Sequence, residues 1–299
     1  MEQIKLSQEV NLSAIVHGMW RLPEWNLSPN EIIRLVEECV ELGIDTFDHA
    51  DIYGDYMVEE LFGNALGQAK TLNQKIKVVT KCGIKLRSKN RPDHYIQHYD
   101  TSYDHIIWSV ENSLKKLQRD NIDVLLIHRP DPLSNPEEIA EAFTKLKKEG
   151  KVKEFGVSNY LPHQFDALQA YMDSPLVTNQ IEISVAALQE FENGAISLCQ
   201  EIGIPPMAWS PLAGGNIFKA ETHRFLTIKN VLHKIAEQYG VSIDQIMYAW
   251  LLKHPANIIP IVGSGKIERV QSAVNALNID LTTQQWFELW VASKGENVP

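Results

Sequence analysis

Four polar residues lie at or just after short apolar runs of the kind that form buried strands. Asp48 ends IDTFD, Tyr53 follows five residues later, Lys81 ends IKVVTK, and His128 ends IDVLLIH. Together these side chains suit proton donation to a carbonyl oxygen while a hydride reaches the carbonyl carbon. A phenol, with a pKa of about 10, is a weak acid near neutral pH. An adjacent ammonium should lower that pKa, a carboxylate should hold the ammonium, and a histidine can orient the carbonyl and stabilise the alkoxide.

A lone polar residue at the end of a strand is more often a solvated rim residue than a functional one. The combination is more informative, because Lys81 follows a buried apolar run where an unpaired charge would be costly. Asp48 can provide the partner that this charge needs. We therefore predict a catalytic site built from Tyr53, Lys81, Asp48 and His128.

These four residues can meet only in a fold that gathers the ends of several strands. Short apolar runs alternate with segments of helical period eight times, which predicts a parallel α/β sheet covered on both faces. A closed (β/α)8 TIM barrel fits best, because its sites gather at the carboxyl ends of the strands. The expected strands are 15–20, 44–47, 76–81, 122–127, 152–157, 177–181, 206–209 and 258–262.

The expected helices have recognisable ends. Ser28 is followed by a proline and an early acid, which is typical of a helix start, and this first helix should close at Gly43. The other helices are expected at 58–67, 103–117, 136–149, 162–171, 188–202, 228–239 and 266–277.

Two further elements are expected outside the repeat. A polar, alternating opening at 4–16 predicts a short N-terminal β-hairpin, and 282–292 predicts an extra C-terminal helix with no strand after it. The aromatic side chains of that helix, Trp286, Phe287 and Trp290, should pack on the barrel rather than face another subunit. No linker or low-complexity tract interrupts the alternation, so residues 1–299 are expected to form a single domain.

The main rival fold is an open doubly wound sheet. Such a sheet should carry a G-x-G-x-x-G fingerprint after its first strand, but this chain has GMWR there. The nearest match begins at Gly263, after the eighth expected strand, and has Glu268 where the third glycine belongs. The barrel is therefore preferred.

Composition limits the kinds of partner. A formal net charge of −10 argues against nucleic acid, because nucleic-acid binders usually have a basic face. The three cysteines, Cys39, Cys82 and Cys199, are too widely spaced for a disulfide framework or a zinc knot. No secretion signal or long apolar span is found. We expect a cytoplasmic monomer or weak homo-oligomer that acts on a small molecule and contacts no membrane.

The residues that suggest this chemistry also resemble a known family. DHADIYG, residues 48–54, is similar to the D-x-A-x-x-Y-G segment of the aldo-keto reductases, and Lys81 in VVTKCG and His128 in LLIHRPDP match the other tetrad positions. The resemblance covers nearly the whole chain. It implies reduction of an aldehyde or ketone to an alcohol with NADPH, with Tyr53 as the proton donor.

The resemblance also implies a cofactor site. Ser158, Asn159 and Gln180 are similar to residues that bind the nicotinamide carboxamide, and Trp209 takes the place of a tyrosine that stacks on the ring. The segment after strand eight enters a helix whose amide groups favour phosphate, and its basic side chains favour NADP over NAD. The expected cofactor-binding residues are Ser158, Asn159, Gln180, Trp209, Ser210, Pro211, Leu212, Gly263, Ser264, Lys266 and Arg269.

Two features depart from the family pattern. Ala273 occupies a place where the family often has an asparagine that contacts adenine, and the chain ends soon after its last helix. Substrate selectivity should then depend mainly on segment 85–99 and on aromatic residues such as Trp20, Trp25 and Tyr56.

Two other functions remain open. The same fold serves in cofactor-binding regulatory or scaffold subunits, although the intact tetrad argues against that. Metal-dependent hydrolysis would need clustered ligands, and this chain offers only a lone His17 at strand one, with His49 and Asp51 further on. We therefore expect no metal site.

Overall fold

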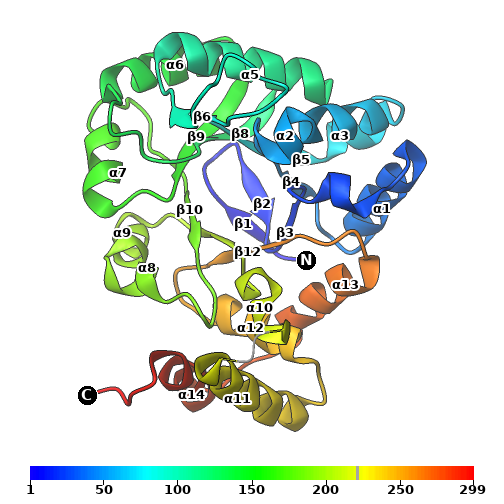
Figure 1. The fold of residues 1–299 in the computed structure, drawn as a ribbon, viewed down its shortest axis with the longest axis vertical. Helices are drawn as coiled ribbons and strands as arrows, with labels where there is room; N and C mark the ends of the chain where they lie inside the picture. The colour runs from blue at the N-terminus through cyan, green and yellow to red at the C-terminus, as the bar shows by residue number, and fades with distance from the viewer. Residues whose placement is uncertain (220–221) are drawn as a thin grey trace.

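The computed structural model describes residues 1–219 and 222–299. Eight parallel strands close into a barrel in the order β10-β11-β12-β3-β4-β5-β8-β9, which confirms the predicted (β/α)8 fold (Figure 1). The barrel strands are β3 (Val16–Gly18), β4 (Thr46–Asp48), β5 (Lys77–Cys82), β8 (Ile122–Ile127), β9 (Val152–Ser158), β10 (Asn179–Glu182), β11 (Met207–Trp209) and β12 (Ile259–Val262).

A helix follows each barrel strand and covers the outside of the sheet (Figure 1). In chain order these helices are α1 (Pro29–Glu41), α3 (Val58–Leu66), α5 (Tyr103–Leu117), α6 (Pro136–Lys148), α7 (Pro162–Gln169), α9 (Ala195–Ile202), α12 (Ile243–Leu252) and α13 (Ile267–Asn275). Further elements are β6 (Ile84–Lys85), β7 (His98–Tyr99), α2 (Tyr53–Tyr56), α4 (Lys70–Lys75), α8 (Gln189–Glu192), α10 (Asn216–Lys219), α11 (His223–Tyr239), α14 (Thr283–Lys294), η1 (Leu22–Trp25), η2 (Ala213–Gly215) and η3 (Ala276–Asn278).

The end of the first helix explains why the next strand, β4, begins two residues later than expected. Ser28 and Glu31 form a capping box at its start. At its end Gly43 has φ +89°, and the next residue, Ile44, donates its backbone N–H to the Cys39 carbonyl at 2.9 Å. Because the Ile44 amide is bonded to the end of α1, β4 begins at Thr46 instead of at 44.

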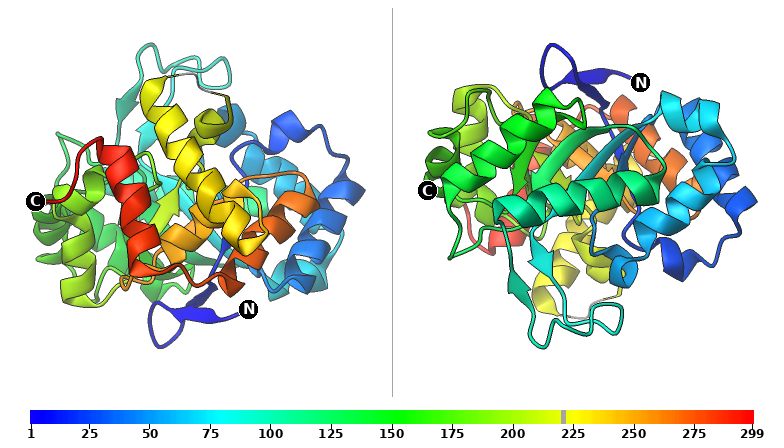
Figure 2. Two further views of the ribbon diagram at one scale, coloured as in Figure 1. Left: turned by 90° about the horizontal axis from the view of Figure 1, so that it is seen from below. Right: turned by 90° about the horizontal axis from the view of Figure 1, so that it is seen from above.

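The N-terminal hairpin closes one end of the barrel. β1 (Gln3–Lys5) and β2 (Asn11–Ser13) pair antiparallel, so the hairpin ends before Val16, which instead pairs with Ile261 inside the barrel. Leu12 packs in one cluster with barrel side chains such as Val79. Figure 2 shows the hairpin and the segment that contains β6 and β7 at opposite ends of the molecule. The amino end of the barrel is thus covered, and the carboxyl end faces the viewer in Figure 1.

Two of the expected helices were wrong in detail. The single helix expected at 188–202 is two helices, α8 and α9, because Gly194 at the break has φ +91°. The helix expected at 228–239 belongs to α11, which packs beside α14 outside the barrel (Figures 1 and 2). The barrel helix before β12 is α12, in which six consecutive residues from Ile246 to Leu251 are buried. A helix buried on most of its circumference lacks the one-sided apolar period that identifies a surface helix.

The C-terminal aromatic residues pack within the chain, as expected. The rings of Trp286 and Trp250 stack with centroids 4.8 Å apart, and each indole N–H donates to the carbonyl of the other residue at 3.1 Å. Trp290 stacks on Trp286 at 5.5 Å, while Phe287 stays 41% exposed. Across residues 1–219 and 222–299, no helix is long and apolar enough to cross a membrane.

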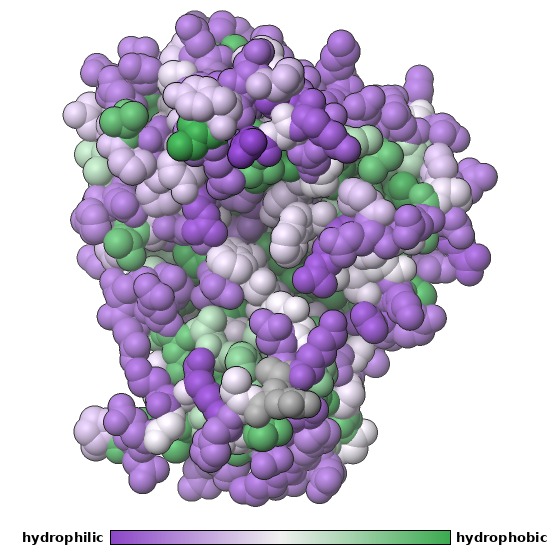
Figure 3. Space-filling view, viewed as in Figure 1, coloured by the Kyte–Doolittle hydropathy of each residue, from purple (hydrophilic) through white to green (hydrophobic). Residues whose placement is uncertain are grey.

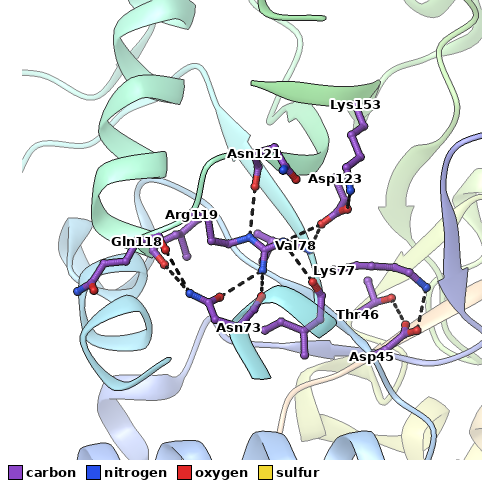
Figure 4. Close-up of polar contacts among 12 residues, drawn as sticks. Asp45, Thr46, Asn73, Lys77, Val78, Gln118, Arg119, Asn121, Asp123 and Lys153 are labelled. Atoms are coloured by element: carbon purple, nitrogen blue, oxygen red, sulfur yellow. Dashed lines mark hydrogen bonds and ion pairs between the residues drawn. The ribbon is translucent and has the colours of Figure 1, made fainter. Parts of the chain in front are cut away.

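A buried polar network ties the loop before β8 to the start of β5 (Figure 4). Arg119 donates to the Asn73 and Ile76 carbonyls and lies 3.3 Å from an Asp123 carboxylate oxygen. Asp123 also accepts from the Val78 amide and from Lys153. The Arg119 and Asp123 side chains are only 9% and 4% exposed.

We expect Arg119→Met to destabilise the fold by about 3 kcal/mol, because buried carbonyls lose a charged donor and Asp123 loses part of its compensation. Urea unfolding measures this loss. The matched control is Arg34→Met, whose exposed (i, i+4) pair with Glu38 should contribute less than about 1 kcal/mol. Equal losses from the two variants would contradict the prediction.

Candidate active site

The Lys81 ammonium is the centre of the site. Its nitrogen lies 2.8 Å from both Asp48 carboxylate oxygens, 2.8 Å from the His49 carbonyl and 3.0 Å from the Tyr53 hydroxyl. The Lys81 side chain is 0% exposed and that of Asp48 is 3% exposed. Lys81 lies near the carboxyl end of β5, Asp48 ends β4, and Tyr53 begins α2, so one end of the barrel brings all three together.

Charge and burial set the protonation states of this group. Burial acts to lower the pKa of Lys81, but Asp48 and Tyr53 outweigh it and the pKa is raised, so the ammonium stays charged. For Tyr53 the sequence-based expectation of a lowered pKa was wrong. Burial raises the pKa of its hydroxyl, and the Lys81 ammonium only partly opposes this rise. The Tyr53 hydroxyl therefore keeps its proton at neutral pH.

His128 lies beside Tyr53, with ring centroids 5.9 Å apart at 77°. Burial lowers the pKa of His128 well below its ordinary value, and the positive charges of Lys81 and Arg129 add to this effect. Its ring is thus neutral near pH 7, and its Nδ1 has no hydrogen-bond partner in the described part of the chain. A neutral imidazole at this place can donate one hydrogen bond to a carbonyl oxygen.

The residues expected to bind nicotinamide form a continuous chain of hydrogen bonds. Trp209 donates from its indole N–H to the Asn159 side-chain oxygen at 2.9 Å, and the Asn159 amide donates to the Ser158 hydroxyl at 2.9 Å. Ser158 donates to the Gln180 carbonyl at 2.7 Å. The Gln180 side-chain amide donates to Asp48 at 2.8 Å, a contact that sequence reasoning missed. The chain of hydrogen bonds therefore links β9, β10 and β11 to the Lys81 centre.

Figure 3, which shows the carboxyl end, reveals a hollow near the middle of this face. Trp209 is half-buried at the end of β11, and Pro211 is buried in the turn that follows it. Ser210 opens that turn with φ +52° and accepts a backbone hydrogen bond from Ala213 at 2.8 Å, so Leu212 lies inside it.

The segment after β12 forms a second polar region. It lies between the ends of β11 and β3, because β12 pairs with both of these strands. Ser264 is buried, its hydroxyl accepts from the Lys266 amide at 3.2 Å, and its carbonyl lies 2.9 Å from a His17 ring nitrogen. Gly263, Lys266 and Arg269 are exposed, and Lys266 is the residue directly before α13. Two cations beside the backbone amides of a helix start are suited to an anion.

Comparisons with known proteins agree with this geometry. Residues 14–291 match the model of the Aldo/keto reductase family. The chain belongs to this family of oxidoreductases. It is 51% identical to the uncharacterized oxidoreductase YcsN of Bacillus subtilis and 43% identical to a 6-dehydroglucose reductase of Agrobacterium fabrum, with 100% of each chain covered in both cases. A Klebsiella pneumoniae aldo/keto reductase, solved with NADP and acetate, matches with a TM-score of 0.78 and 25% identity over 96% of this chain and 93% of that one.

The structure separates the aromatic residues considered for selectivity in this aldo/keto reductase. Trp20 is 57% exposed and its ring lies 6.4 Å from that of Tyr53. Trp25 instead packs against Gly265, where an added Cβ would be 2.6 Å from the indole. The Tyr56 hydroxyl accepts from the Leu86 amide at 2.7 Å and so holds segment 85–99. Of these three aromatics, Trp20 is therefore the one whose ring lies beside the Tyr53 ring.

Two further positions bear on the family pattern. Ala273 is fully buried in the core, so this position belongs to the packing of α13. The residues considered for a metal have separate surroundings: His17 bonds to Ser264, Asp51 accepts from Ser109, and His49 packs on Phe62 with its pKa lowered to about 3 by burial. Residues 1–219 and 222–299 contain no group of three or more His, Cys, Asp or Glu side chains arranged for a metal ion.

Proposed function

We propose that this aldo/keto reductase reduces an aldehyde or ketone to an alcohol with NADPH, and that Tyr53 donates the proton. The observation that carries the proposal is the Lys81 nitrogen within hydrogen-bond distance of both Tyr53 and Asp48 in a buried setting. When bound, NADPH supplies the hydride. Because Tyr53 is protonated in the resting site, Lys81 acts by stabilising the phenolate as the proton leaves, and Asp48 keeps Lys81 charged and in place.

His128 and the hydrogen-bonded chain have supporting roles in this proposal. A neutral His128 donates a hydrogen bond to the substrate oxygen, which orients the carbonyl and stabilises the alkoxide. Asn159 fixes the plane of Trp209, whose indole face serves as a stacking surface for nicotinamide, with Ser158 and Gln180 beside it. The second polar region suits the phosphates of the cofactor, because its donor set is cationic in an otherwise acidic chain.

The name of one relative suggests a substrate class to test. The name of the Agrobacterium relative, 43% identical over the full length, makes a sugar aldehyde the first substrate to test. We place the reaction in the cytoplasm, because Cys39, Cys82 and Cys199 are all free thiols. The deciding experiment is NADPH oxidation across 6-dehydroglucose, simple aldehydes, ketones and quinones. Tight NADPH binding without turnover on any carbonyl, together with a stable protein partner, would instead favour the regulatory or scaffold subunit.

Arg269→Ala tests the cofactor region. We expect the Kd for NADPH to rise about tenfold to a hundredfold, because the 2′-phosphate loses a charged hydrogen bond of about 1.5 to 3 kcal/mol, and the Kd for NADH to stay unchanged. Quenching of protein fluorescence measures both constants. Arg34→Ala, on the outer face of α1, is the control and should alter neither. Equal affinity of the parent protein for NADPH and NADH would contradict the cofactor proposal.

A further inference from the structure

The segment that carries Tyr53 is held in a strained conformation. Gly54, Asp55 and Tyr56 follow it with φ values of 55°, 60° and 70°. The last two have side chains, and each non-glycine residue in this left-handed region costs about 1 to 3 kcal/mol. Such a run persists only where the surroundings fix it.

One face of α5 fixes this segment at three points. Ser109 donates to an Asp51 carboxyl oxygen at 3.0 Å, and Ser113 donates to Glu59 at 2.9 Å. These serines are four residues apart, so they lie on the same side of the helix. Lys116, one turn further on, donates to the Tyr56 carbonyl at 2.6 Å. The contacts lie before, within and after the strained run.

Asp51 is the unusual member of this set. It is 5% exposed, and its second carboxyl oxygen has no hydrogen-bond partner in the described part of the chain. Burial raises the pKa of Asp51 to about 8, and the buried Glu59 carboxyl adds to this rise, while Ser109, the Ile52 amide and Lys116 oppose it. The titratable groups that face Asp51 are Glu59 of α3, Lys116 of α5, Cys82 of β5, and Tyr53 and Tyr56 of α2.

We propose that Asp51 is a positioning residue that must carry its proton for Tyr53 to act as the proton donor. Uncharged Asp51 accepts from Ser109 and holds the Tyr53 segment on α5 at little electrostatic cost. Loss of the Asp51 proton places a buried negative charge near Tyr53, which raises the pKa of the phenol and makes it a poorer acid. Reduction should therefore slow as the pH rises through about 8, where Asp51 ionises. This inference rests on the proposed function.

The test is the dependence of kcat on pH, from about pH 6 to about pH 10, in four proteins. In the parent, kcat should fall as the pH rises through about 8 and then level off at the lower rate of the enzyme with ionised Asp51. Asp51→Asn, which is uncharged at every pH, should keep kcat at neutral pH within about threefold and lose this decline. Glu59→Gln should move the decline to lower pH, because it removes a charge that raises the pKa of Asp51. Ser109→Ala should lower kcat at all pH values.

An infrared titration gives a second readout that needs no substrate. The parent should show the band of a protonated carboxyl group that disappears above a pH of about 8. Because burial also raises the pKa of Glu59, the band belongs to Asp51 only if Asp51→Asn lacks it and Glu59→Gln keeps it. An unchanged alkaline decline in Asp51→Asn, or the absence of a protonated carboxyl at neutral pH in the parent, would overturn the inference. Lack of turnover in the parent with every carbonyl would overturn the proposed function instead, while the infrared result would still decide the protonation of Asp51.

Discussion

Tyr53→Phe should lower kcat for carbonyl reduction by about a hundredfold to ten-thousandfold, because the variant keeps the ring and removes the hydroxyl that lies 3.0 Å from Lys81. The Kd for NADPH should stay within about threefold of the parent value, since this hydroxyl contacts none of the residues proposed to hold the cofactor. Single-turnover kinetics, followed by the loss of NADPH absorbance, separates the chemical step from product release.

The matched control for this change is Tyr160→Phe. Tyr160 is 5% exposed, and burial raises the pKa of its hydroxyl as it does for Tyr53, but it has no contact with Lys81 in the described part of the chain. Turnover of Tyr160→Phe should remain near the parent value. If Tyr53→Phe kept more than about a tenth of the parent kcat on several aldehydes, another group would have to be the donor.

Lys81→Met should destabilise the fold by about 3 to 5 kcal/mol as well as abolish turnover. Among the described residues, the variant leaves the Asp48 carboxylate, 3% exposed, with the Gln180 amide as its remaining side-chain donor. The free energy of unfolding in urea, with the slope checked for constancy, measures this loss.

The double variant Asp48→Asn with Lys81→Met isolates the cause of that loss. Removing both charges leaves no uncompensated ion. The double variant should therefore be more stable to unfolding than Lys81→Met alone by at least about 2 kcal/mol, with turnover still absent. Additive losses in the double variant would show that packing of the lysine stem, rather than the buried charge, accounts for the destabilisation.

The barrel could be predicted from the sequence because the apolar period of each segment agrees with the eightfold alternation of strands and helices. The bounds expected for β8 and α5 match the observed ones, since β8 is an uninterrupted buried run and α5 has a one-sided apolar period. The apolar period failed to predict α12, because this helix is buried on most of its circumference. It also failed to separate α8 from α9, because one glycine, Gly194, ends the helix within a continuous helical pattern.

The members of the site were also predictable, whereas their electrostatics were not. A parallel barrel brings the ends of β4, β5 and β8 to one face, so the proximity of Asp48, Lys81 and His128 follows from topology. The pKa of Tyr53 depends on how much water the neighbouring segments exclude, and these are distant in sequence. The Gln180 contact with Asp48 depends on a rotamer, so no spacing rule could have indicated it.

The hairpin of β1 and β2 covers the amino end of the barrel, and its Leu12 side chain is wholly buried there. For the proposed function, this leaves the carboxyl end of the barrel as the side from which both cofactor and carbonyl should enter. In the proposed reaction, the molecule that binds deeper at that end should enter first and leave last.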